Sequence, residues 1–382
     1  MNKNKLAFTI ILLAFITQSV LVAAHRAQEK SLAEIFQTGK VRLIPEVTIT
    51  EESMARKTFF SSIMDIALDE QGSLYACDFK ESNIKKFNTS GSFLGTIGRP
   101  GQGPGEFNSP IEVEWSKGQL YVRELMNMRV SILDSSGQFV NSFPIDMFGG
   151  TWLKMRALPD GRFLVQKEKT DRKDMDAAQE TSIDLYSPEF KFIKTIYQHE
   201  VRTHKYVTEP RYSRVAIPFA ASVFWEVAPS GKVIIGYSGK YEFEIHDPDK
   251  GKVSSFSHTY SPIEVTAKDK ELLLRGTVSA SGLHLGTSEN APRVTEFPRY
   301  KPAYHSIKID AEGNIWVQLY ASVATKAVPR MDVFDCTGQF LNSVRFVEGA
   351  VPYIMAPRSN GFWAATIAKN DEWVIIKYRI SE

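Results

Sequence analysis

Hydrophobic and polar residues alternate along most of this chain in short runs, and turns that contain glycine separate the runs. One pair of runs flanks Gly72, and a later pair with the same pattern flanks Gly118. A second turn follows each pair, at Gly91 and at Gly137. Both turns recur after 46 residues (Gly72 to Gly118, Gly91 to Gly137). The chain therefore contains an internal repeat, which is the first feature that any fold prediction has to explain.

The same unit occurs four more times, with its first turn at Gly161, Gly231, Gly313 and Gly361. Each copy contains short runs rich in Val, Ile, Tyr, Phe and Trp, residues that favour strands. Glycine supplies the positive φ that tight hairpin turns require. Four strands per repeat at this period are typical of a propeller blade. The pattern predicts an all-β fold, a six-bladed β-propeller with four antiparallel strands per blade.

The two ends of the repeat array complement each other. The sixth copy ends after its third strand, at residues 373–380, and an unassigned strand-like run precedes the first copy at residues 41–50. We expect this N-terminal strand to close the last blade, because such pairing removes the open edge that the ring would otherwise keep.

The N-terminus has the features of an export signal. Lys3 and Lys5 precede an apolar run over residues 6–24, which ends in small residues suited to cleavage. The run is also long enough to span a bilayer, so an uncleaved anchor is the alternative. We predict a signal peptide over 1–24, a linker over 25–40 and the propeller over 41–382. The protein would be exported, periplasmic or extracellular, with no membrane span after cleavage.

Charge and cysteine content narrow the possibilities further. The 46 basic and 44 acidic residues give a net charge of +2, which offers no broad basic surface and predicts no nucleic-acid partner. Cys77 and Cys336 are the two cysteines. The repeat places them on opposite faces and four blades apart, so we expect free thiols.

One family resemblance follows from the motifs. Residues 98–110 (GRPGQGPGEFNSP) resemble the glycine-rich loop of NHL-repeat propellers, as do residues 120–122, 127–130 and 134–137 that follow. The resemblance is good over the first two copies, fair over the fifth, and weak over the other three. It implies the fold of exported bacterial six-bladed propellers, most of unassigned activity. The wider class includes binding scaffolds and a few metal-dependent enzymes.

The loops of the predicted propeller differ between its two faces. Turns between strands 1 and 2 and between strands 3 and 4 of each blade share one face, here called the tight-turn face. Loops between strands 2 and 3 and between blades share the other, here called the insertion face. All the long segments fall on the insertion face: 166–181, 197–222, 259–304 and 318–330. Because functional residues concentrate in long loops on a rigid scaffold, this face is expected to bind the ligand. The alternative is that the insertions only cap the channel.

The insertions carry aromatic, imidazole and arginine side chains, which suit a protein, peptide or glycan ligand through stacking and bidentate hydrogen bonds. They also suit an ordinary wet surface. The candidate ligand-binding residues are His199, Arg202, His204, Tyr206, Arg211, Tyr212, Arg299 and Tyr300.

The motifs that suggest catalysis or metal binding do not fit their patterns. His199 and His204 are five residues apart, whereas a zincin helix needs four. Residues 247–251 begin like a calcium loop but lack its distant glutamate and fit a hairpin turn. We therefore predict no catalytic residue, no metal ligand and no cofactor. The leading function is a non-catalytic binding scaffold.

A metal-dependent hydrolase or lyase, with its site at the mouth of the central channel, is the alternative function. It would take Ca or Zn as its cofactor. Its candidate residues stand at the ends of second strands: Asp78, Glu124, Gln166 and Gln318. A purely structural envelope protein without a ligand is a third possibility.

Overall fold

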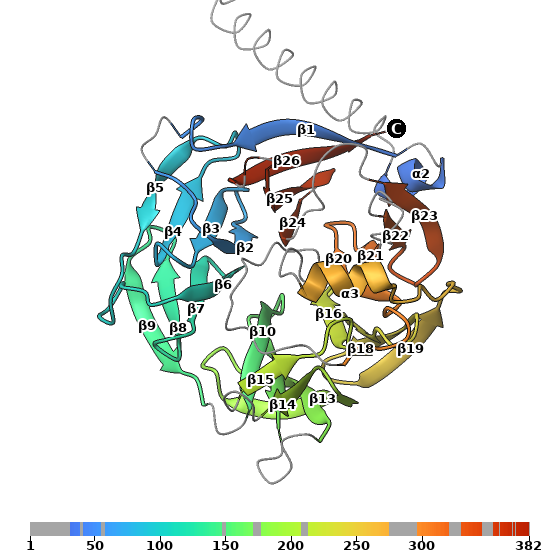
Figure 1. Ribbon diagram of the computed structural model, residues 1–382. Helices are drawn as coiled ribbons and strands as arrows, with labels where there is room; N and C mark the ends of the chain where they lie inside the picture. Colours follow the sequence, from blue (N-terminus) through green and yellow to red (C-terminus); the bar gives the residue numbers. More distant parts are fainter. Residues whose placement is uncertain are drawn as a thin grey trace, which may run out of the picture.

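The computed structural model describes residues 31–38, 41–54, 58–146, 150–170, 177–207, 213–274, 296–320, 330–345, 354–358, 360–368, 370 and 372–381. The predicted signal peptide lies outside these residues. The described chain forms six four-stranded antiparallel sheets arranged around a central axis, so the predicted six-bladed propeller is confirmed (Figure 1).

Each of the first five blades is built from consecutive strands, numbered from the axis outward. Blade 1 contains β2 (Ile63–Leu68), β3 (Leu74–Asp78), β4 (Asn83–Phe87) and β5 (Phe93–Ile97). Blade 2 contains β6 (Pro110–Ser116), β7 (Gln119–Glu124), β8 (Arg129–Asp134) and β9 (Phe139–Pro144). Blade 3 contains β10 (Thr151–Ala157), β11 (Phe163–Lys169), β12 (Gln179–Tyr186) and β13 (Phe192–Val201).

The fourth and fifth blades follow the same plan. Blade 4 contains β16 (Val223–Val227), β17 (Val233–Tyr237), β18 (Glu242–Asp247) and β19 (Gly251–Ser257). Blade 5 contains β20 (Tyr304–Ile309), β21 (Ile315–Leu319), β22 (Arg330–Phe334) and β23 (Phe340–Arg345).

The sixth blade joins the two ends of the described chain. It contains β24 (Ile354–Arg358), β25 (Gly361–Ile367), β26 (Trp373–Ser381) and, as its outer strand, β1 (Arg42–Ile49). The antiparallel register runs from Arg42 opposite Ser381 to Ile49 opposite Ile375. The predicted closure by the N-terminal strand is confirmed.

Short polar turns fix the hairpins on the tight-turn face. In the second turn of blade 2, the Asp134 side chain accepts hydrogen bonds from the backbone N–H of Ser136 (2.9 Å) and Gln138 (3.0 Å). Gly137 has φ +87° and its ideal Cβ would lie 3.2 Å from Ile97. An aspartate at the start of the turn and glycine at its left-handed position therefore specify this hairpin.

Apolar side chains fill the spaces between neighbouring blades. Phe107, in the glycine-rich loop, is fully buried in a cluster with Tyr75 of blade 1 and Val113 of blade 2. An ideal Cβ on Gly98 would lie 2.3 Å from the Phe107 ring. The loop thus holds a wedge between two blades, and the glycine at position 98 makes room for it.

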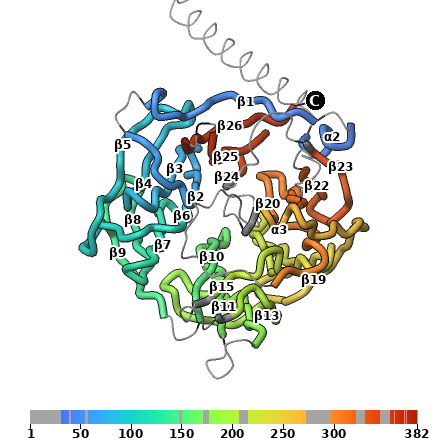
Figure 2. The backbone as a smooth tube through the Cα atoms, viewed as in Figure 1, coloured from blue at the N-terminus to red at the C-terminus, as the bar shows by residue number. Residues whose placement is uncertain are grey.

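Two ordered insertions stand on the insertion face. The hairpin β14 (His204–Val207)–β15 (Ser213–Ala216) follows blade 3, and helix α3 (Ala267–Leu274) follows blade 4. A capping box begins the helix: the Asp269 backbone N–H donates to Thr266 Oγ1 and the Thr266 N–H donates to Asp269 Oδ2. In the view of Figures 1 and 2 both insertions lie in front of the blades.

Part of the segment expected to be a linker is packed onto the propeller. Helix α2 (Leu32–Gln37) buries Leu32 and Phe36 against blades 5 and 6. The Phe36 ring meets Trp316 edge to face at 5.1 Å, and Asn342 Nδ2 donates to the Phe36 carbonyl. The two cysteines are free, Cys77 buried and Cys336 exposed, as expected from the repeat.

Candidate functional site

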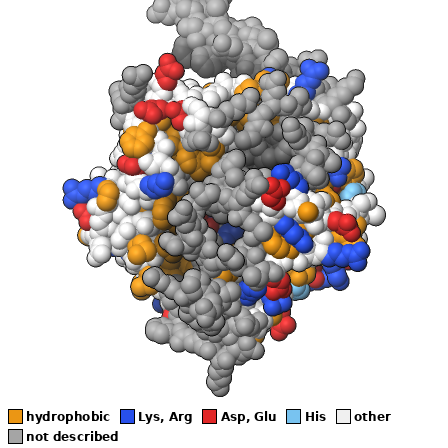
Figure 3. Space-filling model, viewed as in Figure 1, with side chains coloured by type: hydrophobic (Ala, Val, Ile, Leu, Met, Phe, Trp, Pro, Cys, Tyr) orange, Lys and Arg blue, Asp and Glu red, His pale blue; other side chains and the backbone are white. Residues whose placement is uncertain are grey.

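The innermost strands surround a channel that contains two cavities. A cavity of about 670 Å³, here called the funnel, opens between the strand 1–2 turns of the blades on the tight-turn face. A cavity of about 270 Å³ lies toward the insertion face and is lined by the first residues of β2, β6, β10, β16 and β20. Figure 3 views the insertion face, where charged side chains are visible within a central hollow. Arg156 and Lys308 line both cavities.

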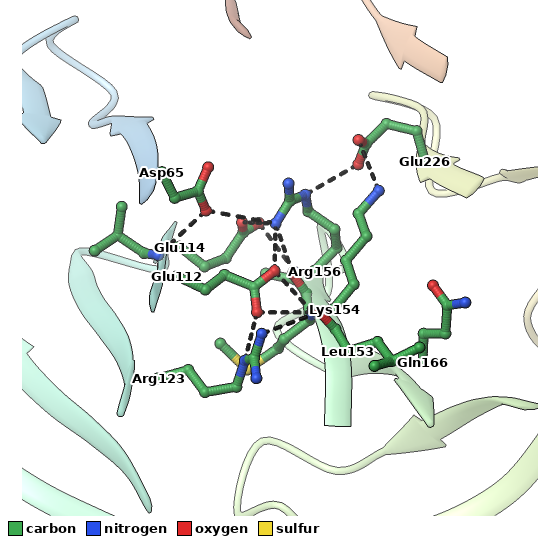
Figure 4. A network of polar contacts seen from close by, with 12 residues as sticks. Asp65, Glu112, Glu114, Arg123, Leu153, Lys154, Arg156, Gln166 and Glu226 are labelled. Atoms are coloured by element: carbon green, nitrogen blue, oxygen red, sulfur yellow. Dashed lines mark hydrogen bonds and ion pairs between the residues drawn. The ribbon is translucent and has the colours of Figure 1, made fainter. Parts of the chain in front are cut away.

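A group of charged side chains, here called the ionic belt, separates the two cavities (Figure 4). Blades 1 to 5 all contribute to it, mostly from their innermost strands. Its members are Asp65, Glu112, Glu114, Arg123, Lys154, Arg156, Glu226 and Lys308.

Arg156 lies at the centre of the belt. Its Nη1 is 2.9 Å from Glu112 Oε1, 3.7 Å from Glu114 Oε2 and 3.9 Å from Asp65 Oδ2. Its Nε donates to Glu226 Oε1 at 3.1 Å. One guanidinium therefore neutralises carboxylates from three different blades, and the carboxylates raise its pKa against the cost of burial.

The carboxylates of the belt also satisfy backbone groups. An innermost strand has one edge without a neighbouring strand, so its buried N–H groups need other acceptors. Asp65 accepts from the N–H of Val113 (3.3 Å), and Glu112 accepts from that of Met155 (2.9 Å). Glu114 likewise accepts from Ala157 (3.0 Å). Each bond runs from one blade to its neighbour, so the belt connects blades as well as filling the channel.

Burial and neighbouring charges shift the pKa values of the belt in opposite directions. Burial raises the pKa of Glu114 to about 8, against the opposing charge of Arg156. Burial also acts on Glu226, but Lys154, Arg156 and Lys308 outweigh it and lower the pKa of Glu226 to about 2. Burial lowers the pKa of Lys154 to about 8, although Glu226 opposes this. Near neutral pH the belt thus holds Glu114 largely as the neutral acid.

Substitution of Glu114 by Gln is expected to remove part of the pH dependence of stability. The pKa of Glu114 is about 8 in the folded state and about 4.5 in the unfolded chain. Between about pH 4.5 and pH 8 the folded protein therefore binds a proton that the unfolded chain has released, so the free energy of unfolding falls as the pH rises. The slope lost with the substitution is at most about 1.4 kcal/mol per pH unit. Urea unfolding of the native protein and of Glu114→Gln at pH 5, 6.5 and 8 measures the difference between the two slopes. Parallel pH profiles of the two proteins would contradict the assignment.

Asp78 and Glu124, two of the residues proposed for the channel mouth, are buried in hydrogen-bonded clasps. Asp78 accepts from the N–H groups of Ser61 and Ser62 and from Lys85 Nζ at 2.9 Å. Glu124 stands at the same position in blade 2, six residues after the turn glycine, and accepts from Arg129 Nε at 2.7 Å. In both blades an acidic residue at the end of the second strand accepts from a basic residue on the third strand. This repeated contact gives both carboxylates a structural role.

Arg129 holds the glycine-rich loop, since its guanidinium also donates to the carbonyls of Gln102, Gly103 and Glu106.

Gln166 lines the 270 Å³ cavity and accepts from Trp225 Nε1 at 2.9 Å. Gln318 is buried in β21. Among the four residues proposed for the channel mouth, only Gln166 lines the 270 Å³ cavity.

Three residues of the predicted ligand-binding set, Arg202, Arg299 and Tyr300, lie on the segments after blades 3 and 4. Arg202 Nη1 pairs with Glu296 Oε1 at 3.0 Å, which joins the segment after β13 to the segment before β20. Arg299 lies over the Tyr300 ring at 5.0 Å and both are exposed.

The histidines of the set pack locally. His204 Nδ1 is 2.8 Å from Thr203 Oγ1. His199 packs against Tyr237 of blade 4 at 4.2 Å. Tyr206 belongs to β14, while Arg211 and Tyr212 lie outside the described residues.

The ionic belt is what sequence reasoning missed. Its signal was present, because charged residues interrupt the first run of five copies where the pattern calls for apolar ones, as at Asp65, Glu114 and Glu226. First runs line the axis of a propeller, so charges there face the channel. Within the described part of the chain, no group of three or more His, Cys, Asp or Glu residues is arranged to hold a metal ion. No helix there is long and apolar enough to cross a membrane.

The fold and the channel define a six-bladed propeller with a charge-filled axis, and solved structures share this fold. A candidate exported protein from Bacteroides fragilis NCTC 9343 matches with a TM-score of 0.55 and 13% identity, over 93% of this chain and 98% of that one. A member of the DUF4221 family from Bacteroides vulgatus ATCC 8482 matches with a TM-score of 0.55 and 11% identity, over 90% and 99%. At these identities the likeness concerns the fold alone. No family model matches the chain, and no curated protein matches its sequence.

Proposed function

We propose that this protein is an exported, non-catalytic binding scaffold that holds a protein, peptide or glycan on its insertion face. The N-terminal apolar run and the structural likeness to a candidate exported protein support export. The resemblance of residues 98–110 to the NHL loop supports membership of a class that includes binding scaffolds.

The observation that carries the proposal is the pairing of two insertions. Arg202 and Glu296 are 94 residues apart, and their ion pair at 3.0 Å brings the insertion after blade 3 against the insertion after blade 4. A rigid ring thus presents a composite surface rather than separate loops, which is how loop-based binding sites are built on stable scaffolds.

The chemistry of this surface suits a polar ligand with planar groups. Arg299 is 76% exposed in its side chain and stacks on Tyr300, which is 40% exposed. Exposed arginine and tyrosine supply bidentate hydrogen bonds and stacking contacts. Peptide carbonyls, carboxylates and sugar rings all match such groups.

The proposal is tested by screening the full chain against a glycan array and a displayed peptide library, then measuring the best binder by calorimetry. The double variant Arg299→Ala/Tyr300→Ala is expected to weaken binding at least about 10-fold, since exposed Arg and Tyr dominate such contacts. Arg379→Ala, at an exposed arginine of β26, the third strand of blade 6, serves as the matched control.

Two outcomes would overturn this function. One is a binder whose affinity the insertion-face variant leaves intact while substitutions at Glu70 and Lys117, on the tight-turn face, abolish it. The other is conversion of the bound peptide or glycan to product, read by mass spectrometry, which would establish an enzyme instead.

A further inference from the structure

The funnel has the form of a small-molecule site. Residues from all six blades line its roughly 670 Å³, from the tight turns to Glu114, Arg156, Glu226 and Lys308 of the ionic belt. Small-molecule sites are typically concave, about 300–1,000 Å³ in volume, and mostly apolar with a few placed polar groups. The funnel lies on the opposite side of the belt from the insertion face, so it is independent of the function proposed above.

The walls of the funnel are apolar. Its lining includes Leu68, Trp115, Leu158, Pro229, Ile309 and Met355. Trp115 is held in place, because its ring stacks on Tyr75 at 5.2 Å and its Nε1 donates to Glu70. A preorganised aromatic wall of this kind binds an apolar group without first losing rotamer freedom.

The acids around the rim are already engaged. Asp69 accepts from the backbone N–H of Gln71 and Ser73 within its own turn. Asp310 accepts from Asn314 and from Trp316 Nε1. These carboxylates are engaged within their own turns. The polar group of a ligand would therefore be bound by the residues at the floor of the funnel.

The floor of the funnel is formed by the ionic belt, and two of its polar groups, on Lys308 and Glu114, have no hydrogen-bond partner within the described chain. Among the described residues, Lys308 Nζ makes no hydrogen bond, and its nearest carboxylate oxygen, Glu226 Oε2, is 3.8 Å away. Glu114 accepts at Oε1 from Ala157, but its Oε2 has no hydrogen-bond partner within the described chain and lies 3.7 Å from Arg156 Nη1. As a neutral acid near pH 7, Glu114 would donate a proton from that second oxygen.

Charge counting favours an anion at this floor. The belt contains four basic side chains (Arg123, Lys154, Arg156, Lys308) and four carboxyls. With Glu114 neutral, at most three carboxylates face four cations, which leaves an excess positive charge inside a low-dielectric channel. A ligand carboxylate would supply the missing negative charge and accept from Lys308.

We propose that the funnel binds a small amphipathic carboxylate, with its carboxylate over Lys308 and Glu114 and its apolar body against Trp115 and the proline- and leucine-lined wall. The molecule is recognised by one anionic head and one apolar body. A neutral or cationic compound of the same length lacks the group that Lys308 requires.

Isothermal titration of the full chain at pH 7 with decanoate and decylammonium below their micelle concentrations, and with decanol below its solubility limit, tests the proposal. Decanoate is expected to bind at least about 10-fold tighter than either analogue, as a charge-assisted hydrogen bond is worth that much. Lys308→Met is expected to remove this preference. Lys240→Met, at an exposed lysine outside the channel, should leave it unchanged.

A second variant separates binding from stability. Ala311 is an exposed residue in the first turn of blade 5 and lines the funnel, so Ala311→Trp narrows the mouth without touching the belt. It should weaken decanoate binding at least about 10-fold by steric exclusion, with an unchanged melting temperature. Equal binding of decanoate and decanol by the native protein, or full decanoate affinity in Ala311→Trp, would overturn the proposal.

Discussion

Replacement of Arg156 by Met is expected to lower the free energy of unfolding by about 3–5 kcal/mol, the usual cost of removing one partner from a buried ionic network. The side chain is only 16% exposed, and it is shared by Glu112, Glu114, Asp65 and Glu226. Methionine keeps much of the volume but leaves these carboxyls without their central cation. Urea denaturation at pH 7, followed by tryptophan fluorescence, measures the loss.

Two further variants make this result interpretable. Arg299→Met removes an exposed guanidinium that lies 3.7 Å from Glu264, and a surface pair of this kind contributes about 0–1 kcal/mol. Adding Glu226→Gln to Arg156→Met removes one of the stranded charges and should recover part of the stability. If Arg156→Met cost no more than Arg299→Met, the belt would be a solvated group of charges rather than a structural element.

The fold was predictable because its information is local and repeated. Turn glycines such as Gly137 and turn acids such as Asp134 specify hairpins largely through residues of the turn itself. The missing last strand and the spare run at residues 41–50 then indicated the closure that β1 and β26 make. Six copies of one signal leave little room for another architecture.

The channel was harder to predict, because its contacts depend on the ring and not on any single blade. Arg156 and Glu226 are 70 residues apart and meet only when blades 3 and 4 converge on the axis. Asp78 and Glu124, by contrast, pair with a basic residue of their own blade. Carboxylates at strand ends suggest ligands, yet their repeated position after the turn glycine marks a structural clasp within each blade. In a repeat protein, a residue type that recurs at the same position of several blades indicates a structural contact. A residue that occurs in one blade alone, such as Lys308 in the channel, indicates a candidate site.

Deletion of residues 1–57 is expected to abolish cooperative unfolding. The deletion removes β1 and α2 and exposes the edge of β26. It also removes four buried apolar side chains, Leu32, Phe36, Ile49 and Met54. At about 1.5–3 kcal/mol each, their burial is comparable with the whole stability of a typical domain, about 5–15 kcal/mol. Differential scanning calorimetry of the shortened chain should show no sharp transition.

The closing strand also touches blade 1, since an ideal Cβ on Gly91, in the β4–β5 turn, would lie 2.5 Å from Val47. Its loss should therefore loosen blades 1 and 6 together, because both pack against it. A chain that lacks only residues 1–30 keeps every described contact and is the control. A synthetic peptide of residues 41–54, added in excess, should restore a cooperative transition by pairing with β26. An unchanged transition after deletion of residues 1–57 would mean that five complete blades and one three-stranded blade close the ring without help from the N-terminal strand.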